Sequence, residues 1–153
     1  MTIIVTGAAG FIGSNFVLNW FKHQHEKVIA LDKLTYSGNL ENLKSVENNK
    51  NYVFVHGDIG DSKLISQILQ KHQPRAIVNF AAESHVDRSI HGPDEFMLTN
   101  IMGTYRMLNA VRFFYNDLSN IDKMNFRFLH VSTDEVYGSL SPIDPAFKEI
   151  NKY

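Results

Sequence analysis

Short apolar runs alternate along this chain with stretches of helical periodicity. Five runs read as buried strands because they are apolar, rich in β-branched or aromatic residues and bounded by turns: residues 2–5, 28–31, 52–55, 76–80 and 126–132. Between them, apolar residues recur at helical spacing from about residue 11 to 23 and again over 64–69, where Asp61 is a plausible cap. This alternation predicts an α/β fold with a parallel sheet covered by helices on both faces. Right-handed crossovers then give the strand order 3-2-1-4-5, with the ligand at the carboxyl ends of strands 1 and 4.

The turn after the first strand carries three glycines, Gly7, Gly10 and Gly13, spaced three apart. Glycine lets the backbone approach a phosphate, and the helix that follows offers free N–H groups and a positive dipole end to an anion. Asp32 ends the second strand, where an acid can accept hydrogen bonds from an adenosine ribose. Glycine turns are common, and the alternative is an ordinary βαβ turn. The strand, turn, helix and acid together predict a dinucleotide site on a Rossmann-type doubly wound sheet.

Other polar or small residues follow the remaining strands. Residues 33–39 form a loop that either wraps the adenosine end of a cofactor or simply connects. Ala81 and Ala82 let a loop pass close to a cofactor, although they equally suit tight packing. Asp134 and Glu135 follow the fifth strand, and both can reach one site only if the strand ends there, because neighbours in a strand face opposite sides. Adjacent acids are more often simply solvated.

A long helix is predicted from Pro93 to about residue 118. Its apolar band is wider than one sheet-facing stripe requires. Two interpretations compete: a deeply buried core helix, or a helix with one face on the sheet and another on a partner. We favour the second, which predicts a homodimer through residues 93–118 in the complete protein.

Composition narrows the function classes. The net charge of −1, with both signs interspersed, gives no reason to expect a nucleic-acid or membrane partner. The absence of cysteine excludes disulfides and thiolate metal sites and fits a cytoplasmic protein. Residues 1–21 carry no charge, but three glycines, two asparagines and the lack of a basic start argue against a signal or membrane segment. His23 and His25 lack helical i, i+4 spacing and a third ligand, so no metal site is expected.

The motifs at 7–13, 32–39, 81–87, 100–104 and 132–138 resemble the extended short-chain dehydrogenase/reductases over essentially the whole chain. The most specific segment, Thr133-Asp134-Glu135, is similar to that of the nucleotide-sugar 4,6-dehydratases within this family. Related epimerases typically carry Ser-Ser or Thr-Ser at this place, without the acid pair.

The resemblance implies a reaction in which NAD⁺ oxidises the sugar at C4, water is lost across C5–C6, and the hydride returns to C6. It implies that Glu135 takes the C5 proton and that Asp134 protonates the departing C6 hydroxyl. The elimination needs one carboxylate and one carboxylic acid, so the pKa values of the two acids must differ. Thr133 would hydrogen-bond the C4 oxygen, and Ser84 would line the sugar or nicotinamide pocket.

The resemblance also implies NAD as cofactor and a nucleotide sugar as substrate. Asp32 disfavours NADP, because a 2′-phosphate would meet a carboxylate. The predicted cofactor site combines the three glycines with the residues that match the family's NAD contacts. It comprises Gly7, Gly10, Phe11, Ile12, Gly13, Asp32, Lys33, Leu34, Thr35, Asp58, Ile59, Phe80, Ala81, Ala82 and Thr99.

One family motif is absent from these 153 residues. Family members carry a Tyr-x-x-x-Lys in which the Tyr deprotonates the C4 hydroxyl, but Ser141 stands where Tyr137 would need its Lys, and no Lys follows Tyr153. We therefore interpret residues 1–138 as an incomplete NAD(P)-binding Rossmann domain and 139–153 as a surface tail leading to a missing catalytic helix. These residues alone are expected to be inactive, and to be unstable or self-associating. The alternatives are a dehydratase or epimerase of another nucleotide sugar, or a non-catalytic dinucleotide-binding module.

Overall fold

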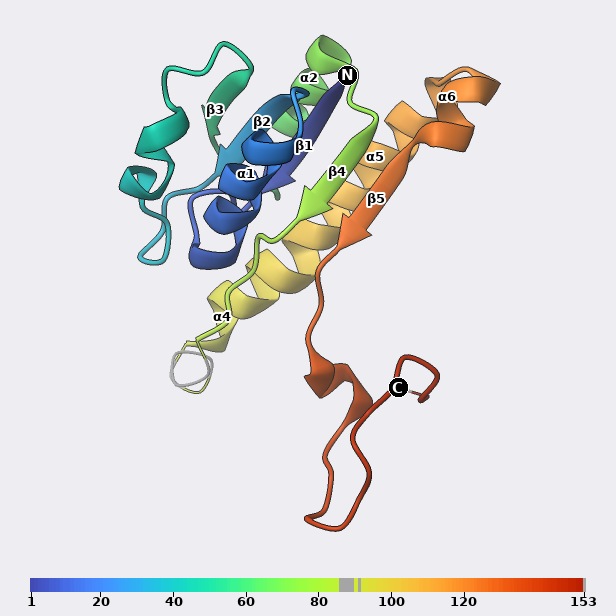
Figure 1. The fold of residues 1–153 in the computed structure, drawn as a ribbon. Helices are drawn as coiled ribbons and strands as arrows, with labels where there is room; N and C mark the ends of the chain where they lie inside the picture. Colours follow the sequence, from blue (N-terminus) through green and yellow to red (C-terminus); the bar gives the residue numbers. More distant parts are fainter. Residues whose placement is uncertain (86–89, 91, 153) are drawn as a thin grey trace.

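The predicted parallel sheet is present in the computed structural model, which describes residues 1–85, 90 and 92–152 (Figure 1). Its five strands lie in the order β3-β2-β1-β4-β5, which confirms the predicted order. They are β1 (Thr2–Thr6), β2 (Lys27–Asp32), β3 (Tyr52–His56), β4 (Ala76–Asn79) and β5 (Arg127–His130). Val86 and Asp87 of the third family motif, and Tyr153, lie outside the described residues.

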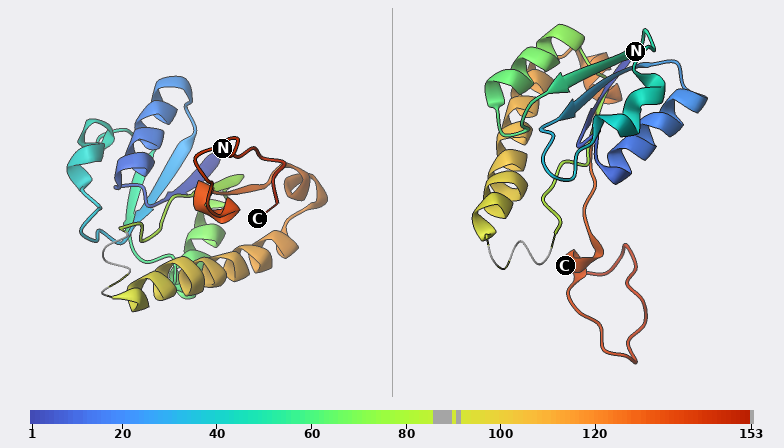
Figure 2. Two further views of the ribbon diagram at one scale, coloured as in Figure 1. Left: turned by 90° about the horizontal axis from the view of Figure 1, so that it is seen from below. Right: turned by 90° about the vertical axis from the view of Figure 1, so that its left-hand side faces the viewer.

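Helices cover both faces of the sheet (Figure 2). Helix α1 (Phe11–His23) lies on one face, while α2 (Ser62–His72) and α5 (Thr104–Asp117) pack together on the other. Successive side chains of β1 point to opposite faces of the sheet. Ile4 packs with residues of α2 and α5, whereas Ile3 and Val5 pack on the α1 side. Burying each such side chain stabilises the fold by about 1.5–3 kcal/mol. As predicted, Asp61 caps α2, since its carboxylate accepts the N–H groups of Lys63 and Leu64 at 3.0 Å.

The long helix differs from its prediction. Instead of one α-helix over residues 93–118, the backbone runs from α4 (Pro93–Phe96) through a π-helical segment, η2 (Met97–Gly103), into α5. Apolar periodicity carries no signal for the wider π turn, because the turn depends on what the helix meets. Here Gly103 is pressed against Ile59, and a Cβ on Gly103 would lie 3.2 Å from the Ile59 Cγ1.

Only one face of this helix is buried. Met107, Ala110, Val111 and Phe114 join the core, whereas Ile101, Tyr105 and Leu108 are 53%, 60% and 44% exposed. The interpretation as a deeply buried core helix is therefore wrong for this chain.

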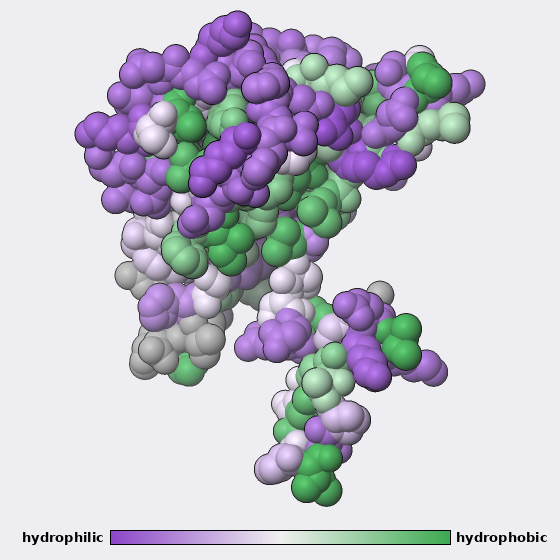
Figure 3. Space-filling view, viewed as in Figure 1, coloured by the Kyte–Doolittle hydropathy of each residue, from purple (hydrophilic) through white to green (hydrophobic). Residues whose placement is uncertain are grey.

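Among the described residues, three short elements were not predicted. They are the 3₁₀ turn η1 (Leu40–Val46), the helix α6 (Asn120–Asn125) and the 3₁₀ turn η3 (Asp134–Tyr137). Strand β5 ends at His130, two residues earlier than expected, so the acid pair lies in η3 rather than at the end of a strand. Residues 138–152 form no helix or strand and extend away from the sheet, with apolar side chains at the far end of the segment (Figure 3).

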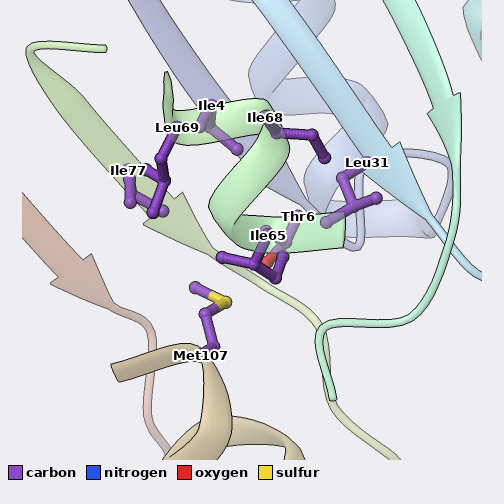
Figure 4. A pocket seen from close by; sticks show the side chains of 8 residues that line it. All are labelled: Ile4, Thr6, Leu31, Ile65, Ile68, Leu69, Ile77 and Met107. Carbon is purple, nitrogen blue, oxygen red and sulfur yellow. The ribbon is translucent and has the colours of Figure 1, made fainter. Parts of the chain in front are cut away.

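The core also contains a small cavity between the sheet, α2 and α5 (Figure 4). Its volume is about 10 Å³, and its lining is apolar apart from Thr6. Since this is about the volume that one water molecule needs, the cavity is a packing feature and not a ligand site. None of the helices among the described residues combines the length and the apolar character needed to span a bilayer.

Candidate functional site

A cleft of about 940 Å³ opens at the carboxyl ends of the strands, where the order of the sheet reverses between β1 and β4. It lies where a doubly wound sheet is expected to bind its ligand. All the predicted cofactor residues line it except Leu34, and so do Ser84, Thr133 and Glu135. Sequence reasoning did not assign to the site the other lining residues, which are Leu31, Ser37, Gly57, Glu83, Phe96, Asn100, Thr104, His130, Val131 and Ser132.

The glycine turn leaves no room for side chains at two of its three glycines. Gly7 has a φ of +63°, and a Cβ there would lie 2.7 Å from the backbone nitrogen of Ala81. A Cβ on Gly13 would lie 2.1 Å from the Gly7 carbonyl oxygen. Gly10 is the N-cap of α1 and has no side chain that could accept a hydrogen bond from the helix. The first N–H groups of α1, whose residues line the cleft, therefore have no side-chain partner from the cap. The turn therefore has the shape and the dipole of an anion-binding cradle.

Asp32 is held rigidly at the edge of this cradle. It is 8% exposed, and its two oxygens accept the backbone N–H groups of Ala9 at 2.8 Å and Leu34 at 2.7 Å. Each carboxylate oxygen retains a second lone pair, which suits the two hydroxyls of a ribose. Leu34, with a φ of +55°, holds Asp32 through its backbone, and its side chain packs with the core on the α1 side. Leu34 is not among the residues that line the cleft, and its direct contact with a cofactor stays a prediction.

An ion pair closes the β2–β3 end of the cleft. The Lys33 Nζ lies 2.9 Å from the Asp58 Oδ2, and the Gly60 N–H donates to the Asp58 Oδ1 at 2.7 Å. Burial acts to raise the pKa of Asp58, but the Gly60 N–H and the Lys33 ammonium outweigh it, so the pKa lies below its ordinary value. The hydrogen bond with Asp58 raises the pKa of Lys33. Lys33, Thr35 and Ser37 all line the cleft, so the 33–39 loop borders the site and does more than connect.

The opposite wall is tied to the π-helical segment. The Asn100 side chain accepts the Glu83 N–H and donates to the Glu83 carbonyl, both at 2.8 Å. The Tyr36 hydroxyl donates to the Glu83 Oε2 at 3.0 Å, which links this wall to the 33–39 loop. Glu83 and Asn100 thus shape the cleft. The sequence signal that could have identified them is that Glu83 lies in the family motif 81–87 and Asn100 in the family motif 100–104.

The acid pair lies beside the cleft in η3. The Thr133 hydroxyl accepts the Glu135 N–H at 3.2 Å and donates to the Asp134 Oδ1 at 3.4 Å. Thr133 and Glu135 line the cleft, but Asp134 does not. Both acids are exposed, so their catalytic roles stay predictions. Among residues 1–85, 90 and 92–152, no three His, Asp or Glu side chains converge as a metal site would require.

Comparison with known proteins adds a family match. Residues 4–153 match the family model described as GDP-mannose 4,6 dehydratase. A dTDP-glucose 4,6-dehydratase of Xanthomonas campestris pv. campestris is 56% identical over 139 residues, covering 91% of this chain and 39% of that protein.

Solved structures agree with the sequence matches. A dTDP-glucose 4,6-dehydratase from Streptomyces venezuelae, crystallised with NAD, superposes with a TM-score of 0.84 at 43% identity, covering 99% of this chain and 45% of that one. A UDP-glucose 4-epimerase from Thermotoga maritima superposes at 0.76 and 31% identity, over 95% of this chain and 42% of that one. The chain thus spans less than half the length of the relatives that it matches.

Proposed function

The chain belongs to the GDP-mannose 4,6-dehydratase family, and we propose that it forms the NAD-binding part of a dTDP-glucose 4,6-dehydratase. The single observation that carries the proposal is the cleft at the switch point, where the glycine cradle and Asp32 lie opposite Thr133 and Glu135. The proposed product is dTDP-4-keto-6-deoxyglucose, a deoxysugar precursor, made in the cytoplasm.

The roles of the residues follow from their places around the cleft. When bound, NAD would supply the oxidation at C4 and the later reduction at C6. The cradle of Gly7, Gly10 and Gly13 would hold the diphosphate, and Asp32 would hold the adenosine ribose. Thr133 would hydrogen-bond the C4 oxygen, Glu135 would remove the C5 proton, and Asp134 would protonate the leaving hydroxyl. Because Asp134 does not line the cleft, a small rotation of η3 would have to bring it to the substrate.

Two rival functions remain. A dehydratase or epimerase of another nucleotide sugar would use the same cradle, and the epimerase that superposes on this chain shows that the fold alone does not decide between them. A non-catalytic dinucleotide-binding module would need the glycine cradle and Asp32 but no Tyr-x-x-x-Lys. Asp134 and Glu135 favour the dehydratase, since a module that only binds a dinucleotide needs neither acid.

We expect these 153 residues to bind NAD⁺ at least about 100-fold more tightly than NADP⁺, because a 2′-phosphate would meet the buried Asp32 carboxylate. Titration calorimetry with both dinucleotides checks this. Equal affinities, or no NAD⁺ binding by the folded chain, would refute the cofactor assignment. The same samples incubated with dTDP-glucose should form no 4-keto-6-deoxy sugar above background, since the Tyr-x-x-x-Lys expected to deprotonate the C4 hydroxyl is not among these 153 residues.

We further propose that the helix from η2 to α5 mediates a homodimer. Ile101, Tyr105 and Leu108 follow one another at i, i+4 and i+7, and their exposed side chains form an apolar stripe facing away from the sheet. Light scattering on the complete protein should give the mass of two chains at high concentration. The double substitution Ile101→Glu with Leu108→Glu should halve that mass, whereas Ile121→Glu, at a more exposed position on α6, should leave it unchanged. A wild-type mass of one chain would count against the dimer.

A further inference from the structure

Three polar side chains stand in a row under the cleft, on neighbouring strands. Thr6 of β1 is in register with Asn79 of β4, and Asn79 is in register with His130 of β5. All three occupy the last position of their strand, on the face covered by α2 and α5, because Ile4 and Ile77 two residues earlier pack there. Thr6 and Asn79 are fully buried, whereas His130 is exposed and lines the cleft.

Hydrogen bonds connect the row. The Thr6 hydroxyl donates to the Asn79 Oδ1, and the Asn79 Nδ2 lies 2.9 Å from the His130 Nδ1. A carboxamide has one accepting end and one donating end, so engaging Oδ1 with Thr6 turns the NH₂ group toward the histidine. The NH₂ group can only donate. The His130 Nδ1 must therefore accept, and the neutral ring carries its proton on Nε2.

We propose that Thr6 and Asn79 are positioning residues that hold His130 in the Nε2–H form, which makes His130 a hydrogen-bond donor of the cleft for an oxygen of the bound nucleotide ligand. The nature of this ligand rests on the proposed function, but the form of the ring does not. Asn79 is suited to this role because it is fully buried, so water cannot replace either of its partners. Asn79 therefore couples the orientation of the His130 ring, on the far wall of the cleft, to Thr6 on the strand before the glycine turn.

The ring form can be read directly. With ¹⁵N-histidine labelling, a long-range ¹H–¹⁵N correlation spectrum distinguishes a protonated from an unprotonated Nδ1, and the resonances that disappear in His130→Gln are assigned to His130. We expect an unprotonated Nδ1 and a protonated Nε2 in the wild-type chain. A protonated Nδ1, or an average of the two neutral forms, would overturn the proposal without recourse to any variant.

Variants test whether Thr6 and Asn79 determine which nitrogen of His130 carries the proton. Asn79→Asp offers only acceptors, so the proton should move to Nδ1 of His130. Thr6→Val removes the hydroxyl that orients Asn79 and should give a mixture of both forms, whereas Thr6→Ser keeps the hydroxyl and should restore the wild-type spectrum. A backbone amide spectrum confirms that each variant is folded. An unchanged His130 in folded Asn79→Asp would show that Asn79 does not position it.

Two titrations identify the ligand that His130 contacts. NAD⁺ and dTDP-glucose are added separately to the labelled chain, and the probe that accepts the hydrogen bond should shift the Nε2–H resonance of His130. Loss of that bond in His130→Phe should weaken the binding of this probe by roughly 3- to 10-fold, and His130→Gln, which keeps a donor, should weaken it less. Binding of NAD⁺ or dTDP-glucose without any shift at His130 would refute the donor role. If neither probe binds, the proposed function fails, while the result on the ring form still stands.

Discussion

Gly13→Ala should unfold the turn around which the cleft is built, although alanine is the better helix former. Gly13 is the third residue of α1, so helix propensity alone would favour alanine by about 1 kcal/mol. The tertiary structure opposes this preference, because the new Cβ would lie 2.1 Å from the Gly7 oxygen and 2.8 Å from the Gly7 carbonyl carbon. Both atoms belong to the backbone, so relief requires α1 to move away from the turn. We expect a loss of about 3 kcal/mol or more in the free energy of unfolding and no measurable NAD⁺ binding.

Gly10→Ala is the matched control. Its Cβ would meet only the Gly7 oxygen, at 3.3 Å, which a small shift can relieve. Denaturant unfolding should place Gly10→Ala within about 1 kcal/mol of wild type, and calorimetry should still detect NAD⁺ binding. Equal stabilities for the two variants would show that α1 does not pack against the turn as described.

Asp32→Ala should lower both stability and cofactor affinity. The substitution leaves the N–H groups of Ala9 and Leu34 without their acceptor at a site that is almost closed to water. Losing hydrogen bonds to a buried charged group should cost about 2–4 kcal/mol in the free energy of unfolding. The affinity for NAD⁺ should fall roughly 100-fold, since the ribose loses its acceptor. Thermal unfolding and calorimetry on the same sample measure the two effects.

Two further variants separate the causes of this loss. Asp32→Asn keeps the shape and one accepting oxygen but turns an NH₂ group toward the other N–H, so its effects should be intermediate. Asp61→Ala also removes a carboxylate that accepts two backbone N–H groups, but at an exposed helix cap. It should cost about 1 kcal/mol and leave NAD⁺ affinity unchanged. Weaker NAD⁺ binding by Asp61→Ala would mean that stability alone explains the Asp32 effect.

The parts of the fold that were predicted correctly depend on local signals. Continuous apolar runs bounded by turns located the five strands, and apolar residues at helical spacing located α1. The handedness of crossovers then left one strand order. The glycine spacing and Asp32 located the cleft because carboxyl ends of parallel strands meet at one edge of the sheet.

The parts that were missed depend on contacts between distant residues. The π-helical segment forms where Gly103 meets Ile59, 44 positions away in the chain, and no periodicity records that contact. In η3 Glu135 lines the cleft whereas Asp134 does not, although the two acids are adjacent in sequence. His130 gave no signal as a site residue, because its significance comes from Asn79 on the neighbouring strand.

The chain by itself therefore determines a doubly wound sheet with an anion cradle and an acid at the second strand, since each of these follows from short-range spacing and backbone sterics. Tertiary structure alone decides which side chains reach the cleft, which face of the long helix stays exposed, and which nitrogen of His130 holds the proton. The physical reason is that hydrogen-bond partners and packing neighbours are chosen by register across the sheet, which brings together residues as far apart as Thr6 and Asn79.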